Sequence, residues 1–236
     1  MIISHSKKFV FIHVYKTAGT SVTDALQKWN SLTENIFLRG IEKTLNIEIY
    51  TKGYMSKLRM INRLKGGCHA DVCDLQRNMP EEMFKSYFKF AFVRNPWAWQ
   101  VSLYEYSKRK KGHHQREMMN KFLDFNEYIH WRVENEVRYQ TDVLLNKQGK
   151  FGLNYLGRVE DIDKDFEFCC KQLNIQAVLP KHNVSVTKDY RTYYSEKTAQ
   201  MVAEAFQKDI DNFGYDFDGV SSTAKPKLPV QEIVNN

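Results

Sequence analysis

A short turn near the N-terminus combines the residue types that bind phosphate or sulfate. The segment Lys16-Thr-Ala-Gly-Thr-Ser21 separates an apolar, β-branched run from a helical pattern. A loop of small residues between a strand and a helix leaves backbone N–H groups free, and the helix dipole adds positive potential. Lys16 adds a charge and the hydroxyl side chains add donors, which an ordinary strand–helix connection does not need. We predict that an anionic group binds here, with these residues as its donors: Lys16, Thr17, Ala18, Gly19, Thr20 and Ser21.

A second set of anion-binding residue types stands at Arg94 and Ser102. Arg94 leaves a predicted strand, Pro96 opens a helix, and Ser102 lies about two turns along that helix. A guanidinium group binds phosphate through a fork of two hydrogen bonds, and serine adds another donor. The alternative is an aromatic core helix that Arg94 merely caps.

The residue order in the first turn differs from that of a P-loop nucleotide site. The pattern G-x-x-x-x-G-K-[ST] puts its lysine directly after a glycine, whereas Lys16 precedes Gly19. A P-loop enzyme also uses a carboxylate at the end of a neighbouring strand to hold Mg²⁺, and here that strand ends in Arg94. We therefore expect a nucleotide held by cations and backbone amides without a metal ion. A P-loop-like small-molecule kinase stays open as the alternative.

The elements that must position these residues follow from the apolar patterns. Runs rich in β-branched and aromatic residues predict strands over residues 8–15, 87–93 and 153–159. Because helical patterns alternate with these strands, we expect an α/β fold: a single domain with a central parallel β-sheet flanked by helices. The domain is predicted over residues 1–219, and residues 220–236 are predicted to be a flexible C-terminal extension. The predicted helices cover residues 22–29, 97–110, 122–133, 163–173 and 195–212, the last with Gly214 as its C-cap.

The composition limits the class of protein. Of 236 residues, 42% are apolar, which is enough to bury a core. No apolar stretch approaches the roughly 18 residues of a membrane-spanning helix, so we expect no membrane span. The four cysteines are too few for a disulfide framework and lack the paired spacing of a zinc site, so we expect free thiols and no metal.

The charge balance indicates an anionic partner. The chain has 35 Lys and Arg against 28 Asp and Glu, a net charge of +7. Residues 108–116 carry five of these cations and no acid. They form either a solvated helix end or a rim that binds an anionic acceptor, and both interpretations stay open. A nucleic-acid-binding module that uses residues 57–65 and 108–116 is a further alternative, although we expect no nucleic acid.

Taken together, the two anion-binding segments resemble a known family. Phe11-Ile-His-Val-Tyr-Lys-Thr-Ala-Gly-Thr-Ser21 is similar to the 5′-phosphosulfate-binding motif of sulfotransferases that use 3′-phosphoadenosine 5′-phosphosulfate (PAPS). The segment from Phe92 to Tyr104 is similar to their 3′-phosphate-binding motif. The branch that it resembles is the carbohydrate, membrane-associated Golgi type (sulfotransferase family 2), over about residues 8–217. Weaker similarity continues at residues 157–160, 183–185, 190–194 and 209–215.

The resemblance implies a P-loop-kinase-like sulfotransferase fold and an activity. It implies transfer of a sulfuryl group from PAPS to an acceptor hydroxyl, most often of an anionic or neutral glycan, with 3′-phosphoadenosine 5′-phosphate (PAP) as product. It also implies Ser185 and Lys188 as donors to the nucleotide. The family often has a second arginine where this chain has Trp99 or Gln100, which leaves Arg94 and Ser102 to bind the 3′-phosphate. If the protein is a bacterial enzyme, we expect it in the cytoplasm. If it is a trimmed eukaryotic catalytic domain, we expect it in the Golgi lumen.

Two residues are expected to be catalytic. Lys16 is predicted to stabilise negative charge on the departing phosphate. Histidine has the ordinary pKa that suits a general base, and His69 follows Gly66-Gly67-Cys68 in a stretch where the resembled family has its proposed base. A structural role is the alternative for His69. His182 is a second candidate, and His13 is expected to be a core residue of the first strand.

Overall fold

A four-stranded sheet forms the centre of the computed structural model, which describes residues 1–30, 70–110, 112–113, 115–180 and 189–221. Its strands lie in the order β1 (Ile2–Ser4), β2 (Phe9–Ile12), β3 (Phe88–Val93) and β4 (Tyr155–Arg158). Strands β2, β3 and β4 are parallel, which confirms the predicted α/β fold, and β1 adds an antiparallel edge strand. The carboxyl ends of the parallel strands therefore meet at one edge of the sheet.

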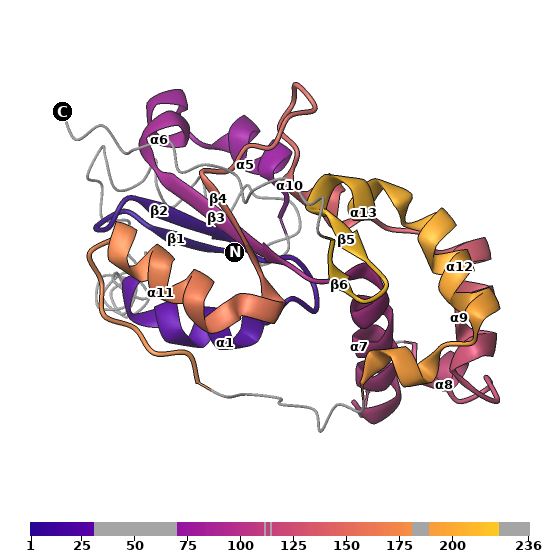
Figure 1. Ribbon diagram of the computed structural model, residues 1–236. Coiled ribbons are helices and arrows are strands. Elements are labelled where there is room, and N and C mark those ends of the chain that lie inside the picture. The colour runs from indigo at the N-terminus through magenta and orange to yellow at the C-terminus, as the bar shows by residue number, and fades with distance from the viewer. Residues whose placement is uncertain (31–69, 111, 114, 181–188, 222–236) are drawn as a thin grey trace, which may run out of the picture.

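One face of the sheet is built from phenylalanine. Successive side chains of a strand point to opposite faces, and here every second residue of β2 and β3 on one face is Phe. All five are fully buried: Phe9, Phe11, Phe88, Phe90 and Phe92. Helices α1 (Gly19–Leu26) and α11 (Ile162–Gln172) cover this face (Figure 1).

Shorter aliphatic side chains form the opposite face of the sheet. Val10, Ile12 and Val93 pack there against α5 (Val72–Asn78), α10 (Gln140–Leu144) and α13 (Gln207–Phe213). Helix α6 (Glu81–Ser86) lies beside α5 on the same side (Figure 1). Coverage of both faces explains why β2 is apolar throughout and why β3 has a single polar residue, the buried Lys89.

A helical layer extends the fold beyond the carboxyl ends of the strands (Figure 1). It contains α7 (Pro96–Arg109), α8 (Arg116–Met119), α9 (Phe125–Asn135) and α12 (Glu196–Ala205). A separate aromatic core that includes Trp99, Tyr128 and Phe206 holds these helices together. A short hairpin of β5 (Tyr215–Asp216) and β6 (Gly219–Val220) and the 3-10 turn η4 (Tyr190–Tyr193) complete the layer.

Several element boundaries differ from the predicted ones. Helix α1 begins at Gly19, before the predicted residue 22, and ends in the 3-10 turn η1 (Gln27–Trp29). The single helix predicted over residues 195–212 is two helices, because the fully buried Phe206 leaves helical geometry with φ −110° and ψ 21°. Gly214 adopts a left-handed conformation (φ 66°) after α13, which confirms it as the C-cap. Helices η3 (Val159–Asp161), α5, α6 and α10 were not predicted because each is too short for an apolar period.

Within the described ranges, no helix is long and apolar enough to cross a membrane.

Candidate anion-binding site

The two predicted anion-binding cations lie at the same edge of the sheet. Ile12 pairs with Ala91 in the parallel register of β2 and β3. Lys16 follows β2 and Arg94 directly follows β3, so both leave the sheet on the side of the helical layer. The charge of Arg94 is among the causes that lower the pKa of Lys16, so the two groups interact across this edge.

The turn after β2 has a strained backbone. Lys16 (φ 63°) and Ala18 (φ 60°) both occupy the left-handed region, which costs a residue with a side chain about 1 to 2 kcal/mol. Thr17 is fully buried and its hydroxyl donates to the Val14 carbonyl at 2.9 Å. The Thr17 hydroxyl therefore stabilises the turn through this hydrogen bond. The backbone N–H of Thr17 is the donor that remains for a ligand.

The N-terminus of α1 has no side-chain cap. Ala18 is its N-cap residue, and the first helical hydrogen bond runs from Val22 N–H to the Ala18 carbonyl at 3.2 Å. The N–H groups of the first turn, at Gly19, Thr20 and Ser21, precede that bond and point out of the helix. Thr20 is exposed and Ser21 is half-buried, so both hydroxyls lie at the protein surface.

Gly19 is required by a close contact with a histidine. A Cβ atom at Gly19 would lie 1.8 Å from Nε2 of His13. The imidazole of His13 stacks on Phe11 with ring centroids 6.0 Å apart. The prediction of His13 as a core residue of the strand is wrong: β2 ends at Ile12, and the half-buried ring packs against the turn.

Lys16 is a partly desolvated cation among other cations. Burial, the largest cause, and the charges of Arg94, Arg109 and Lys110 together lower the pKa of Lys16 to about 8. Its Nζ lies 3.8 Å from the ring centroid of Tyr106 in α7. In the part of the chain that the structure describes, no carboxylate forms an ion pair with Lys16. A bound anion would supply the missing counter-charge.

Arg94 is held through its backbone and leaves its side chain for other contacts. The Gln140 side chain accepts from the Arg94 N–H and donates to the Arg94 carbonyl, both at 2.9 Å. Burial lowers the pKa of the guanidinium, and the nearby Glu160 carboxylate acts in the opposite direction. Glu160 instead accepts from the Asn95 N–H and the Tyr215 hydroxyl, each at 2.8 Å. Among the described residues, Arg94 has no ion-pair partner either.

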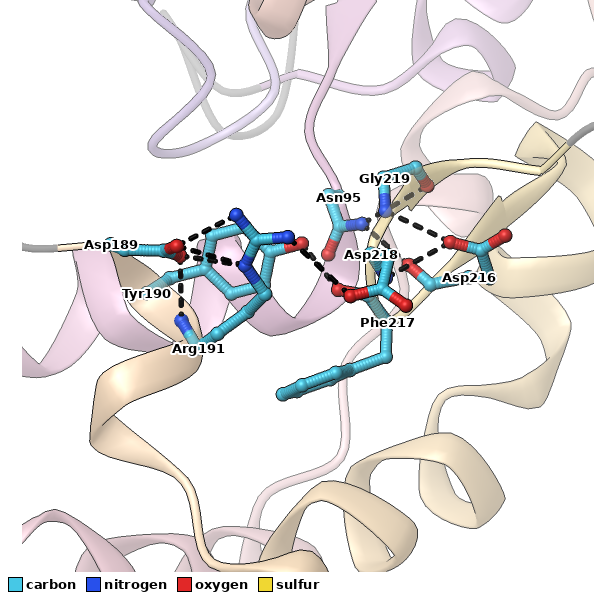
Figure 2. A network of polar contacts seen from close by, with 8 residues as sticks. All are labelled: Asn95, Asp189, Tyr190, Arg191, Asp216, Phe217, Asp218 and Gly219. Atoms are coloured by element: carbon cyan, nitrogen blue, oxygen red, sulfur yellow. Dashed lines mark hydrogen bonds and ion pairs between the residues drawn. The ribbon is translucent and has the colours of Figure 1, made fainter.

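Asn95 fixes the start of α7 next to Arg94. Its Oδ1 caps the helix by accepting from Trp97 N–H at 3.0 Å. Its Nδ2 donates to the carbonyls of Asp216 (2.8 Å) and Gly219 (3.3 Å), which ties the helix to the β5–β6 hairpin (Figure 2). Trp99 adds a tie to the first turn, because its indole N–H donates to the Tyr15 carbonyl at 2.7 Å.

A surface network joins the same hairpin to η4 (Figure 2). Arg191 binds the Asp189 carboxylate through two nitrogens, with Nη2 2.7 Å from Oδ2, and contacts Asp218 at 3.4 Å. The Tyr190 hydroxyl donates to the Phe217 carbonyl. The hairpin is thus held between the start of α7 and η4, on the side of the sheet edge where Arg94 emerges.

The structure brings part of the predicted site together. Residues 16–21 and Arg94 lie at one edge of the sheet, and Ser102 lies half-buried on α7. His69, Ser185, Lys188 and His182 lie outside the described residues, as do residues 222–236 of the predicted extension. Residues 33–66, whose pattern is ambiguous, lie outside them too.

Sequence reasoning missed the residues that reach the site from other elements. An aromatic core helix was the alternative interpretation of this segment, and neither interpretation included Tyr106, which faces Lys16 from α7. The sequence signal was present in the spacing of Tyr106 and Lys110, which lie one helical turn apart and share a 2.6 Å hydrogen bond. Gln140 carried no signal, because it reaches Arg94 only through the fold.

Other candidate sites are weaker. The described residues contain no group of three or more His, Cys, Asp or Glu side chains that is arranged to hold a metal ion. A surface groove beside α11, lined in part by Phe166, Cys170 and Leu179, lies along the helix that covers the phenylalanine face. It contains none of the predicted site residues.

Comparison with models of protein families gives a match. A family model described as "Sulfotransferase family" matches residues 1–216, which include both anion-binding segments. No curated protein matches the chain.

Proposed function

Because the chain belongs to the sulfotransferase family, we propose that it transfers the sulfuryl group of PAPS to a hydroxyl group of a carbohydrate. The observation that carries the donor assignment is the pair Lys16 and Arg94. They extend from adjacent parallel strands, are partly withdrawn from water, and have no ion-pair partner among the described residues. Two such cations suit PAPS, whose ribose carries one anionic group at its 5′ position and another at its 3′ position.

The donor set matches PAPS in its chemistry. Lys16 and the free N–H groups of Gly19, Thr20 and Ser21 would hold the 5′-phosphosulfate. Arg94 and Ser102 would hold the 3′-phosphate, with the guanidinium as a two-pronged donor. Ser185 and Lys188 are further proposed donors to the nucleotide. These groups are cations and neutral donors, and Arg94 stands where a magnesium-dependent enzyme has a carboxylate, so we propose binding without a metal ion.

The same residues support an in-line displacement. Lys16 lies where negative charge would grow on the departing phosphate, and its ammonium would stabilise that charge in a partly water-excluded place. His69 is the proposed general base that takes the proton of the attacking hydroxyl. Lys16 at pKa about 8 is mostly protonated at neutral pH, as this role requires.

The basic end of α7 is the proposed place of the acceptor. Arg109 and Lys110 are exposed, and both act on the pKa of Lys16, so they lie on the approach to the reacting group. This favours an acceptor rim over a merely solvated helix end in residues 108–116. We propose an anionic glycan as the preferred acceptor, with neutral glycans as weaker ones.

Calorimetry with PAP in the presence of EDTA tests the donor assignment. Binding is expected for the wild type and is expected to be strongly weakened in Lys16→Ala and in Arg94→Met. Lys28→Ala is the matched control, because Lys28 is an exposed lysine at the far end of α1 and η1. No binding of PAP to the wild type would refute the proposal, and magnesium-dependent binding of ATP in its place would favour a kinase.

The transfer step has its own test. Labelled PAPS incubated with panels of anionic and neutral glycans is expected to label a glycan. His69→Ala is expected to reduce turnover by about 10²- to 10⁴-fold and to leave PAP binding intact. An unchanged rate in His69→Ala would remove His69 as the base without affecting the donor assignment.

A further inference from the structure

One aromatic side chain lies against the ammonium group of Lys16. The Lys16 Nζ lies 3.8 Å from the centroid of the Tyr106 ring, well within the range of a cation–π contact. Tyr106 lies in the last two turns of α7 and is half-buried. The lysine comes from the turn after β2, so this contact joins the two elements that form the site.

Neighbouring groups hold the ring itself in place. Lys110 donates to the Tyr106 hydroxyl at 2.6 Å, one helical turn further along α7. Tyr15 packs edge-on against the ring with centroids 6.1 Å apart, and His113 does so at 5.5 Å. The Tyr15 hydroxyl and the His113 imidazole also lie 3.4 Å apart. The orientation of the ring is therefore fixed on several sides before any ligand arrives.

The charges around Lys16 make a fixed ring face useful. Arg94 from the end of β3, and Arg109 and Lys110 from the end of α7, all repel the ammonium. The neighbouring titratable groups Tyr15 and His113 bring no negative charge, since burial raises the pKa of Tyr15 to about 12. A flexible lysine stem in such a field would turn toward solvent. The negative face of the ring opposes that movement without adding a carboxylate that a donor would have to displace.

We propose that Tyr106 is a positioning residue for sulfuryl transfer, whose ring face holds the Lys16 ammonium at the mouth of the turn. The inference rests on the proposed function, because it assigns Lys16 to the reacting phosphosulfate. It adds a specific requirement: an aromatic ring at position 106, with the hydroxyl group dispensable for the contact with Lys16.

The contact can be measured without any donor, by NMR of protein labelled in its lysine side chains. The ε-methylene signals of Lys16, identified by their loss in Lys16→Arg, are expected to be shifted upfield by the ring. The shift is expected to persist in Tyr106→Phe and to disappear in Tyr106→Leu. Lys28, whose Nζ lies 4.1 Å from the Trp29 ring centroid, is the internal reference and keeps its shift in both variants. An upfield shift of Lys16 that survives Tyr106→Leu overturns the proposal.

The titration of the same signals adds a readout that a purely structural role would not change. In the wild type the midpoint is expected near pH 8. Tyr106→Leu keeps an apolar side chain but removes the ring face, so the midpoint is expected to fall by about half a pH unit to one and a half. Tyr106→Phe is expected to stay with the wild type. A rise of the Lys16 midpoint in Tyr106→Leu would mean that the ring acts on Lys16 by excluding water and does not attract the ammonium. This result also overturns the proposal.

Kinetics then connect the contact to the reaction. In Tyr106→Leu, kcat is expected to fall about tenfold, the equivalent of one mid-range cation–π contact, and Tyr106→Phe is expected to restore it to within about twofold. Equal kcat values in the two variants refute the positioning role. A wild type without sulfotransferase activity refutes the proposed function instead, and the NMR result is independent of that outcome.

Discussion

Asp209 is a buried carboxylate whose removal should loosen the site from a distance. It is fully buried in α13 and accepts three hydrogen bonds from the start of α10: from the N–H of Gln140 (2.8 Å), the N–H of Thr141 (2.9 Å) and the hydroxyl of Thr141 (2.6 Å). Gln140 in turn holds the backbone of Arg94 on both sides. Asp209→Ala therefore removes the group that fixes Gln140.

The expected loss of stability follows from the donors that Asp209→Ala would leave unpaired. Burial raises the pKa of Asp209 in spite of its hydrogen bonds, so the carboxylate itself is held at a cost. Its removal nevertheless leaves two buried N–H groups and one hydroxyl without an acceptor, each worth about 1 to 3 kcal/mol. Allowing for non-additivity, we expect the free energy of unfolding to fall by about 3 to 5 kcal/mol. In a chain of this size Tm would fall by about 6 to 20 °C.

Urea unfolding and PAP calorimetry test the two parts of this prediction. Asp211→Ala is the control, since Asp211 lies exposed on the same helix and its loss should change the free energy of unfolding by less than about 0.5 kcal/mol. At temperatures where Asp209→Ala remains folded, its affinity for PAP is expected to be lower than that of Asp211→Ala. Equal unfolding free energies in the two variants would refute the reasoning on stability. Equal PAP affinities would refute the coupling through Gln140.

Three further predictions concern other contacts. Gly19→Ala is expected to lower the free energy of unfolding by about 1 to 3 kcal/mol, because the new methyl group would clash with the His13 ring. Adding His13→Ala should recover part of this loss in urea unfolding. Additive losses in the double variant would contradict the contact. Lys89 is 5% exposed, and burial lowers its pKa from 10.5 to about 8, so the unfolded chain binds more protons than the folded chain between these pH values. The free energy of unfolding of the wild type, relative to that of Lys89→Met, should therefore rise with pH across this window by up to about 3 kcal/mol. A difference that does not change with pH would contradict the prediction. The double variant Arg109→Gln/Lys110→Gln is expected to raise KM for an anionic glycan more than for a neutral one, and to weaken the salt dependence of KM. Equal effects on the two glycans would count against the proposal that the basic end of α7 binds the acceptor.

The sheet edge was predictable because it depends on local sequence. The apolar run before Lys16 and the aromatic run before Arg94 each identify a buried strand, and parallel strands necessarily end at a common edge. Pro96 likewise indicates the start of α7 from its residue type alone. For these residues the chain needed no information from distant segments.

The remaining contacts depend on long-range packing that no local pattern encodes. Gln140 reaches Arg94 from 46 residues away. The rotation of α7 that turns Tyr106 toward Lys16 is set by the aromatic core of the helical layer, in which Trp99 of α7 packs against Phe206, the residue between α12 and α13. The break between α12 and α13 has the same origin, since burial of Phe206 in that core overrides a continuous helical pattern.

Among the described residues, the carboxylates near the site accept hydrogen bonds from backbone N–H groups and form no ion pair with Lys16 or Arg94. Glu160 and Asp165 each use one carboxylate oxygen for a backbone N–H and the other for a tyrosine hydroxyl, and Asp209 accepts from two backbone N–H groups and one hydroxyl. These N–H groups belong to Asn95 after β3, to Arg158 as the last residue of β4, and to Gln140 and Thr141 at the start of α10. An acid paired with Lys16 or Arg94 would have to be displaced by the donor, and the energy of that ion pair would be subtracted from the affinity for PAPS. By engaging both oxygens of these carboxylates elsewhere, the fold keeps two positive charges available for an anionic donor, and among the described residues the Lys16 ammonium is held by a ring face that a donor does not have to displace.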